Sequence, residues 1–238
     1  MYKDADQKNE GEYLIRAVIF DMDGVLVDSM SYHALAVQNI FDQIGVKMDK
    51  QDIFEREGER TVDIITFLLE KEAGDASAYD VLDIVERYIR EFNRIVELQV
   101  FDGLKECLSL MSEKFRLSVV SGSDRPIVYD IIEKEFPDVF EVIVTADDVE
   151  RGKPDPQPYL KAVEMLGIDK DECIVIENAP MGVEAAQKAG LCCIAVPTYL
   201  DPEKLKSADI VLRDHRELID YLLGLEPSSA GCAQSPKS

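Results

Sequence analysis

The feature that most constrains this chain is an alternation of short, strongly apolar runs with stretches of helical periodicity. Several runs are continuously apolar, which is typical of strands covered by other elements on both faces. Strands separated by helices are typical of parallel βαβ units, so the sequence predicts an α/β fold with a doubly wound, Rossmann-like, mostly parallel sheet. The predicted strands cover residues 13–20, 115–121, 140–145, 172–177, 192–197 and 209–212, and the predicted helices between them cover 104–114, 125–135, 158–166 and 181–189.

One segment interrupts this alternation. From residue 29 to about residue 100 the sequence shows helical periodicity and no convincing strand. In the stretch TVDIITFLLEKEA, for example, apolar residues recur at helical spacing along one face. We therefore predict a core made of residues 13–28 and 101–223, an inserted all-helical cap domain made of residues 29–100, and flexible tails at 1–12 and 224–238.

The charge balance limits the classes of partner. The chain carries 48 acidic and 26 basic residues, a formal net charge of −22, so we expect no binding to nucleic acid. No run approaches the roughly 18 apolar residues that span a bilayer, so we expect no membrane partner and a cytoplasmic location. An anionic substrate would need local positive charge in its site, against this acidic background. The oligomeric state is not readable from the sequence.

Polar side chains follow the predicted strands at the ends where those strands would meet. The carboxyl ends of parallel strands lie at one edge of a sheet, so residues far apart in sequence can converge there. These residues are Asp21 and Asp23 after the first strand, Ser121 and Gly122 after the second, Lys153 in the loop after the third, and Glu177 and Asn178 after the fourth. The sequence therefore predicts one polar site at this edge.

The two acids after the first strand, Asp21 and Asp23, indicate a cation-binding site. Two carboxylates about 4 Å apart repel each other by about 4 kcal/mol at an effective dielectric constant near 20. A hard dication removes this repulsion, and Mg²⁺ prefers oxygen ligands while keeping water positions that a phosphate can take. We therefore predict Mg²⁺ as the cofactor of the site.

Two motifs in this set resemble those of a known superfamily. DMDGVLVDS, which starts at Asp21, and GKPDP, which contains Lys153, resemble motifs of the haloacid dehalogenase-like phosphotransferases. The resemblance extends from Tyr13 to Leu223 with the motifs in the same order, and the helical insert resembles the cap of the beta-phosphoglucomutase-like branch. It implies that Asp21 is the nucleophile that becomes an aspartyl-phosphate and that Asp23 is the general acid and base.

The resemblance also implies roles for the other strand-end residues. Ser121 and the amides around Gly122 would hold the phosphoryl oxygens, and Lys153 would offset the charge of the nucleophile and of the phosphoryl group.

The implied metal ligands depart from the usual pattern in one position. They are Asp21, the backbone carbonyl of Asp23, Glu177 and Asn178. Many relatives carry two acids where this chain has Glu177 and Asn178. The amide oxygen of Asn178 can bind a cation but adds no charge, so the departure affects the affinity for the ion more than the type of reaction.

The cap residues bear on the choice between two reactions. Beta-phosphoglucomutases place a His in the first cap helix, followed by an Arg and a Lys. His33 stands at the matching position and Arg60 lies near the second, one residue short in spacing, while no matching Lys is present. We therefore predict His33 and Arg60 as substrate-binding residues without favouring the mutase.

The function expected from these residues is a Mg²⁺-dependent phosphatase that acts on a small phosphorylated metabolite such as a sugar phosphate. Two alternatives stay open at this point. One is a phosphosugar mutase of the beta-phosphoglucomutase type. The other is a catalytically weak protein that binds a phosphorylated metabolite, with Asn178 marking a decayed metal site.

Overall fold

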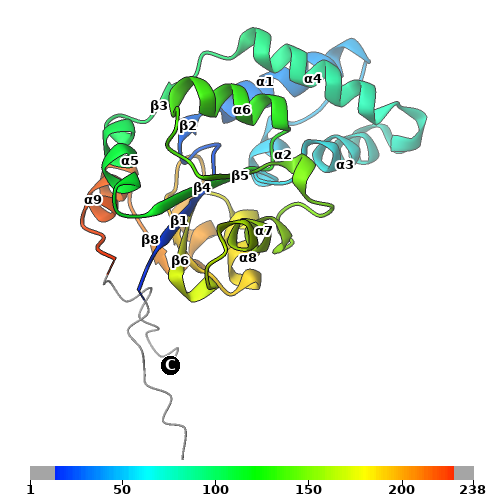
Figure 1. Ribbon diagram of the computed structural model, residues 1–238. Coiled ribbons are helices and arrows are strands. Elements are labelled where there is room, and N and C mark those ends of the chain that lie inside the picture. Colours follow the sequence, from blue (N-terminus) through cyan, green and yellow to red (C-terminus); the bar gives the residue numbers. More distant parts are fainter. Residues whose placement is uncertain (1–13, 228–238) are drawn as a thin grey trace, which may run out of the picture.

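The computed structural model describes residues 14–227 and has a parallel sheet at its centre (Figure 1). Its six strands follow the order β5-β4-β1-β6-β7-β8, and each neighbouring pair is parallel. This arrangement confirms the predicted α/β fold. Each predicted strand contains one observed strand: β1 (Ala17–Phe20), β4 (Arg116–Val120), β5 (Val142–Val144), β6 (Cys173–Glu177), β7 (Cys192–Ala195) and β8 (Ile210–Val211).

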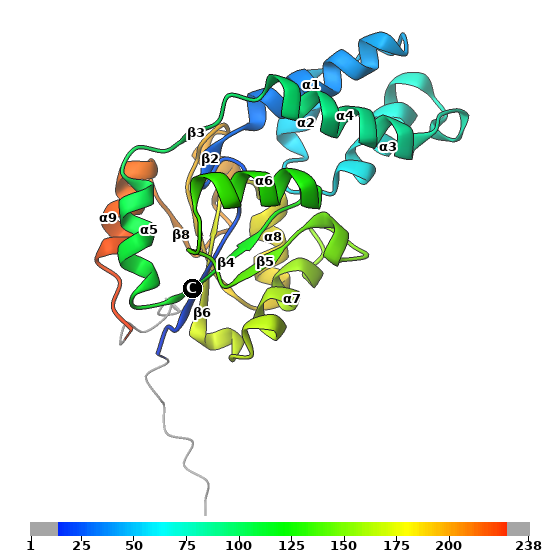
Figure 2. The ribbon, with the colours of Figure 1, turned by 45° about the horizontal axis from the view of Figure 1, so that its top comes forward.

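Helices cover the sheet on both faces, which explains why most residues of its strands are apolar (Figure 2). In β1, Val18 and Phe20 pack into one apolar cluster and Ala17 and Ile19 into another, because successive side chains of a strand point to opposite faces. The first cluster includes side chains of α5 (Leu104–Ser112), α6 (Arg125–Glu135) and α9 (His215–Leu223), and the second includes side chains of α7 (Gln157–Leu166) and α8 (Pro180–Ala189). The helix α9 was not among the predicted helices.

A helical cap lies beyond the carboxyl ends of the central strands (Figures 1 and 2). Its helices are α1 (Met30–Gln43), α2 (Lys50–Glu55), α3 (Thr61–Ala73) and α4 (Val81–Ile95). Their apolar faces are buried; in α4, for example, Ile84, Tyr88 and Phe92 are all at most 3% exposed. This burial agrees with the helical periodicity seen in the sequence.

Two short strands connect the cap to the core. They are β2 (Val27–Asp28) and β3 (Gln99–Val100), and they pair with each other in antiparallel fashion. The prediction of no strand within residues 29–100 was wrong for β3, because a two-residue strand has no periodicity to detect. The predicted domain boundaries stay a prediction. Most of both predicted tails, residues 1–12 and 228–238, falls outside the described residues.

Within residues 14–227, no helix combines the length and the apolar character that crossing a membrane requires.

Candidate active site

Asp21 and Lys153 form the centre of the polar cluster at the edge of the sheet. Asp21 directly follows β1 and is 3% exposed, and Lys153 is 2% exposed. Lys153 Nζ donates hydrogen bonds to Asp21 Oδ1, to Glu177 Oε1 at 2.6 Å and to the carbonyl oxygen of Val120 at 3.2 Å. Asp21 Oδ2 is buried and has no hydrogen-bond partner among the described residues. One oxygen of this carboxylate is therefore held, and the other is free to react.

Burial and neighbouring charges act on both groups of this pair. Burial raises the pKa of Asp21 well above its ordinary value, although the Lys153 ammonium opposes the shift. Burial alone would lower the pKa of Lys153, but the carboxylates of Asp21 and Glu177 raise it overall. The two carboxylates thus favour the charged form of Lys153.

Asp23 is held by hydroxyl groups and by a histidine ring. It accepts hydrogen bonds from the hydroxyls of Ser29 at 2.5 Å, Ser123 at 3.0 Å and Ser121 at 3.3 Å, and it lies 2.9 Å from His33 Nε2. Burial alone would raise the pKa of Asp23, but His33 and the Ser29 and Ser123 hydroxyls lower it overall. Sequence reasoning gave no role to Ser29, the last residue of DMDGVLVDS, or to Ser123, two residues after Ser121.

His33 reaches the core from the first cap helix. Its Nδ1 lies 2.6 Å from the hydroxyl of Tyr88, and its ring stacks on that of Phe92 with 4.2 Å between centroids. Both aromatic residues belong to the buried face of α4. The structure therefore brings His33 to Asp23, and Tyr88 and Phe92 of α4 hold its ring in place.

Glu177 lies against Lys153 rather than open to a cation. Its Oε1 accepts hydrogen bonds from Lys153 and, at 2.6 Å, from the hydroxyl of Tyr159. Its Oε2 accepts hydrogen bonds from the backbone amides of Asn178 at 2.9 Å and Ala179 at 3.2 Å. Both oxygens of Glu177 therefore have protein partners, and its predicted role as a metal ligand stays a prediction that this geometry does not favour. Sequence reasoning missed Tyr159.

Asn178 faces an acid from the cap. Its side-chain Nδ2 donates a hydrogen bond of 2.7 Å to Glu57 Oε1. Asn178 Oδ1 and Glu57 Oε2 are both buried without a hydrogen-bond partner among the described residues. Burial raises the pKa of Glu57 well above its ordinary value; the Asn178 hydrogen bond opposes the shift, and the nearby charge of Asp21 adds to it. Sequence reasoning missed Glu57, which lies in the turn between α2 and α3.

The cap turn that carries Glu57 rests on the core loop that carries Ser121. A Cβ atom added to Gly122 would stand 2.3 Å from the carbonyl oxygen of Gly58 and 2.5 Å from that of Glu59. Gly58 itself has a φ of +91°, a conformation that favours glycine. The absence of a side chain at Gly122 therefore lets the two domains meet over the site.

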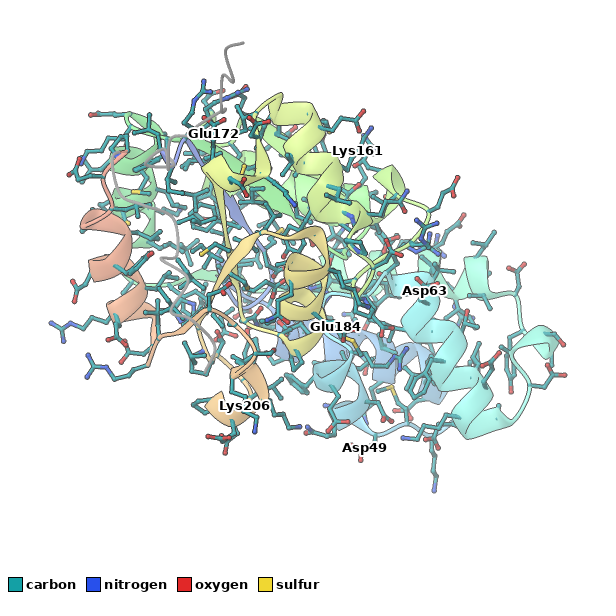
Figure 3. The ribbon with its side chains drawn as sticks, turned by 90° about the horizontal axis from the view of Figure 1, so that it is seen from below. Asp49, Asp63, Lys161, Glu172, Glu184 and Lys206 are labelled. Carbon is teal, nitrogen blue, oxygen red and sulfur yellow. The ribbon has the colours of Figure 1, made fainter. Side chains whose placement is uncertain are left out.

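Arg60 links the cap to the core, and its predicted role in substrate binding stays a prediction. It pairs with Asp63, with Nε 2.8 Å from Oδ2, and it donates a hydrogen bond of 3.3 Å to the carbonyl oxygen of Val149. Asp63 stands at the start of α3, near the surface of the molecule (Figure 3). Arg60 is not among the residues that line the cavity between cap and core. The structure thus uses it as a link between α3 and a loop of the core.

The cavity between cap and core combines acids with apolar side chains. In the described part of the chain, no lysine or arginine lines it. The lining residues are Asp21, Asp23, Met30, His33, Val37, Ile53, Glu57, Gly58, Glu59, Thr61, Ile64, Ile65, Tyr88, Gly122 and Ser123. A bound molecule would therefore meet acids from both sides, Asp21 and Asp23 from the core and Glu57 and Glu59 from the cap, together with apolar and hydroxyl groups.

Comparison with known proteins places this geometry in a family. A family model described as haloacid dehalogenase-like hydrolase matches residues 18–196. The chain belongs to this family. Validoxylamine A 7'-phosphate phosphatase of Streptomyces hygroscopicus subsp. limoneus is 30% identical over 207 residues, which cover 86% of this chain and 96% of that protein. Beta-phosphoglucomutase of Bacillus subtilis (strain 168) is 28% identical over 88% of this chain and 94% of its own length.

Solved structures agree with this membership. A protein from Bacteroides vulgatus, provisionally described as a beta-phosphoglucomutase, superposes with a TM-score of 0.80 at 33% identity, over 90% of this chain and 92% of its own. The predicted resemblance to the beta-phosphoglucomutase-like branch is confirmed. As a haloacid dehalogenase-like hydrolase of this branch, the protein is a phosphatase or phosphotransferase.

The oxygens left free in the site fit a hard dication. No group of three or more His, Cys, Asp or Glu side chains in residues 14–227 forms a ready-made metal site. The free set is mixed instead and consists of the buried, unpartnered oxygens Asp21 Oδ2, Asn178 Oδ1 and Glu57 Oε2. Oxygen ligands of this kind suit Mg²⁺.

Proposed function

We propose that this protein is a Mg²⁺-dependent phosphatase that hydrolyses a small phosphorylated metabolite, in particular a sugar or cyclitol phosphate, through an aspartyl-phosphate on Asp21. The observation that carries the proposal is the state of the Asp21 carboxylate. Lys153 holds one of its oxygens, and the other is buried, unpartnered and next to Asp23. A nucleophile and an acid–base group side by side are what a two-step phosphoryl transfer requires.

The proposed reaction uses the chain's own residues in two steps. In the first, Asp21 Oδ2 attacks phosphorus, the bond from phosphorus to the leaving oxygen breaks, and Asp23 protonates that oxygen. In the second, Asp23 takes a proton from water, the resulting hydroxide attacks phosphorus, and the bond to Asp21 breaks, which releases phosphate. The hydroxyl of Ser121 and the amide of Gly122 would orient the phosphoryl oxygens, and Lys153 would offset their charge.

Bound Mg²⁺ would neutralise the charge that builds up on the phosphoryl oxygens. The residues that would hold it are Asp21, through Oδ2, the backbone carbonyl of Asp23, and Asn178, through Oδ1.

The lining of the cavity favours hydrolysis over mutase chemistry. A phosphosugar mutase passes through a bisphosphate, so its cap must hold a second phosphate. Among the described residues, no lysine or arginine lines the cavity beside Asp21, Asp23 and His33. Arg60 and Lys153 line a smaller adjoining pocket, and Arg60 pairs with Asp63. The names of the relatives, one a phosphatase of validoxylamine A 7'-phosphate and one a beta-phosphoglucomutase, support a small phosphorylated substrate such as a sugar phosphate.

The test compares hydrolysis with isomerisation. The purified protein is incubated with sugar and cyclitol phosphates with and without Mg²⁺, and inorganic phosphate is measured. We expect Mg²⁺-dependent release of phosphate. In parallel, beta-glucose 1-phosphate is supplied with a trace of the bisphosphate; glucose 6-phosphate formed without stoichiometric phosphate would assign the mutase instead. Folded protein without any metal-dependent turnover would favour the binding protein.

A further inference from the structure

The acid Glu57 has no role in the two-step reaction described above, yet it stands inside the site. It is 3% exposed and belongs to the turn between α2 and α3, whereas the other acids around Asp21 belong to the core. Its Oε1 accepts a hydrogen bond of 2.7 Å from Asn178 Nδ2, and its Oε2 has no hydrogen-bond partner within residues 14–227. A buried carboxylate that is half unpartnered is costly unless a cation or a proton compensates it.

The hydrogen bond to Glu57 sets the direction of the Asn178 amide. A carboxylate can only accept, so it must face the NH₂ end of the amide. The amide oxygen, Oδ1, then points away from Glu57, and it is buried without a partner in a residue that is 1% exposed. Groups behind a metal ligand commonly fix its orientation in this way.

This pair lies directly over the turn that follows the nucleophile. A Cβ atom added to Gly24 would stand 2.1 Å from Asn178 Nδ2 and 2.9 Å from Glu57 Oε1. Gly24 follows Asp23, whose backbone carbonyl is one of the predicted cation ligands. The side chains of Asn178 and Glu57 are therefore both next to the turn that carries this carbonyl.

We infer that Glu57 completes the cation site from the cap: it fixes the Asn178 amide with its oxygen toward the cation and supplies the negative charge that an amide lacks. The inference rests on the proposed Mg²⁺-dependent function. Because Glu57 is a positioning residue carried by the cap, the site is complete only while the cap is closed. Cation binding and cap closure then favour each other by the same factor.

The test is a direct measurement of metal binding without substrate. Calorimetry with Mg²⁺, or electron paramagnetic resonance with Mn²⁺, gives the dissociation constant of the wild type, Glu57→Gln, Asn178→Asp and the double variant. We expect Glu57→Gln to weaken binding about tenfold, as is usual for groups that orient a metal ligand. The matched control is Glu55→Gln, which removes the same charge from an exposed position on α2 and leaves the affinity unchanged.

The double variant separates this role from a general loss of charge. Asn178→Asp alone places a carboxylate against Glu57 and gains little affinity, whereas Asn178→Asp in the Glu57→Gln background recovers the wild-type affinity to within about threefold. Circular dichroism confirms that each variant is folded. Limited proteolysis of the cap, with and without metal, gives a second readout: metal protects the wild type and protects Glu57→Gln less.

Each outcome decides one proposal. A Glu57→Gln affinity within about twofold of the wild type, or an effect of Asn178→Asp that is the same in both backgrounds, overturns the inference while the phosphatase function stands. A wild type that binds neither metal ion and has no metal-dependent turnover overturns the proposed function itself.

Discussion

The core half and the cap half of the site are built in different ways. The core residues follow strands that are hydrogen-bonded into one sheet, and they bond to one another, as Lys153 does to Asp21 and Glu177. The cap half consists of His33, on a helix, and Glu57, in a turn, and it reaches the core across a domain boundary. The comparison teaches that the sheet alone preorganises the polar groups of the core. Access of a substrate to these groups, and the balance of charge around them, depend on closure of the cap.

The largest effect is expected for the core nucleophile. Asp21→Asn removes the charge of the attacking oxygen at nearly constant shape. We expect turnover to fall by about 10⁴-fold or more, since loss of a nucleophile costs about 10⁶-fold in a well-studied protease. Phosphate release from sugar phosphates and from para-nitrophenyl phosphate measures this. Activity above about a tenth of the wild type would contradict the covalent route.

The same half should also carry a large part of the stability. Lys153→Ala leaves the buried carboxylates of Asp21 and Glu177 without their cation, and removing one partner of a buried ion pair costs about 3–5 kcal/mol. Urea unfolding in metal-free buffer measures the change. The control is Lys161→Ala, at the surface in Figure 3, where we expect a change of at most about 0.5 kcal/mol. Equal changes in the free energy of unfolding at the two positions would show that the buried ion pair contributes no more to stability than a surface pair.

A methyl group added where the cap turn rests on the core tests whether turnover requires the cap to close. Gly122→Ala keeps the backbone amide but directs a methyl group at the carbonyl oxygen of Gly58, 2.3 Å from its Cβ position. We expect kcat to fall about 100-fold, because a displacement of about 1 Å in a site has that effect.

The matched control is Gly152→Ala, which also adds a methyl group between the core and the cap. Its Cβ would meet Arg60 Cγ at 2.6 Å, part of a flexible side chain, so the fall should be smaller. An active Gly122→Ala variant would show that the cap turn does not rest on this glycine during turnover.

The smallest effect is expected on the outer side of the cap. Arg60 pairs with Asp63 and a backbone carbonyl, so Arg60→Ala should lower kcat/KM by about threefold, the size of a partly exposed ion pair. Steady-state kinetics with a sugar phosphate measures it. A rise of KM by about 100-fold would mean that Arg60 turns inward to bind the substrate. That result would favour the phosphosugar mutase over the phosphatase.

The core half could be predicted because a parallel sheet brings the carboxyl ends of its strands to one edge. Asp21, Ser121, Lys153 and Asn178 lie there although they are far apart in sequence. Which way an acid at a strand end points could not be predicted: Glu177 faces Lys153 and Tyr159, and no spacing along the chain encodes that choice.

The cap half was harder to predict for a physical reason. The period of a helix reveals its buried face, and it correctly predicts α3 over residues 61–73. Glu57 lies in a turn, where charged residues are usually solvated, and its burial depends on how the cap packs against a different domain. His33 was found only because its position matched a family pattern. Its contact with Asp23 is a property of the closed arrangement.

The pairing of β2 with β3 has a consequence for how this protein can change. Val27 pairs with Val100 and Asp28 with Gln99, so the polypeptide leaves the sheet and returns to it at neighbouring points. An insertion whose two ends touch can be lengthened, shortened or exchanged without altering the order of the strands below it. Selection for a new metabolite can therefore rebuild the inserted module while the chemical machinery underneath is inherited intact.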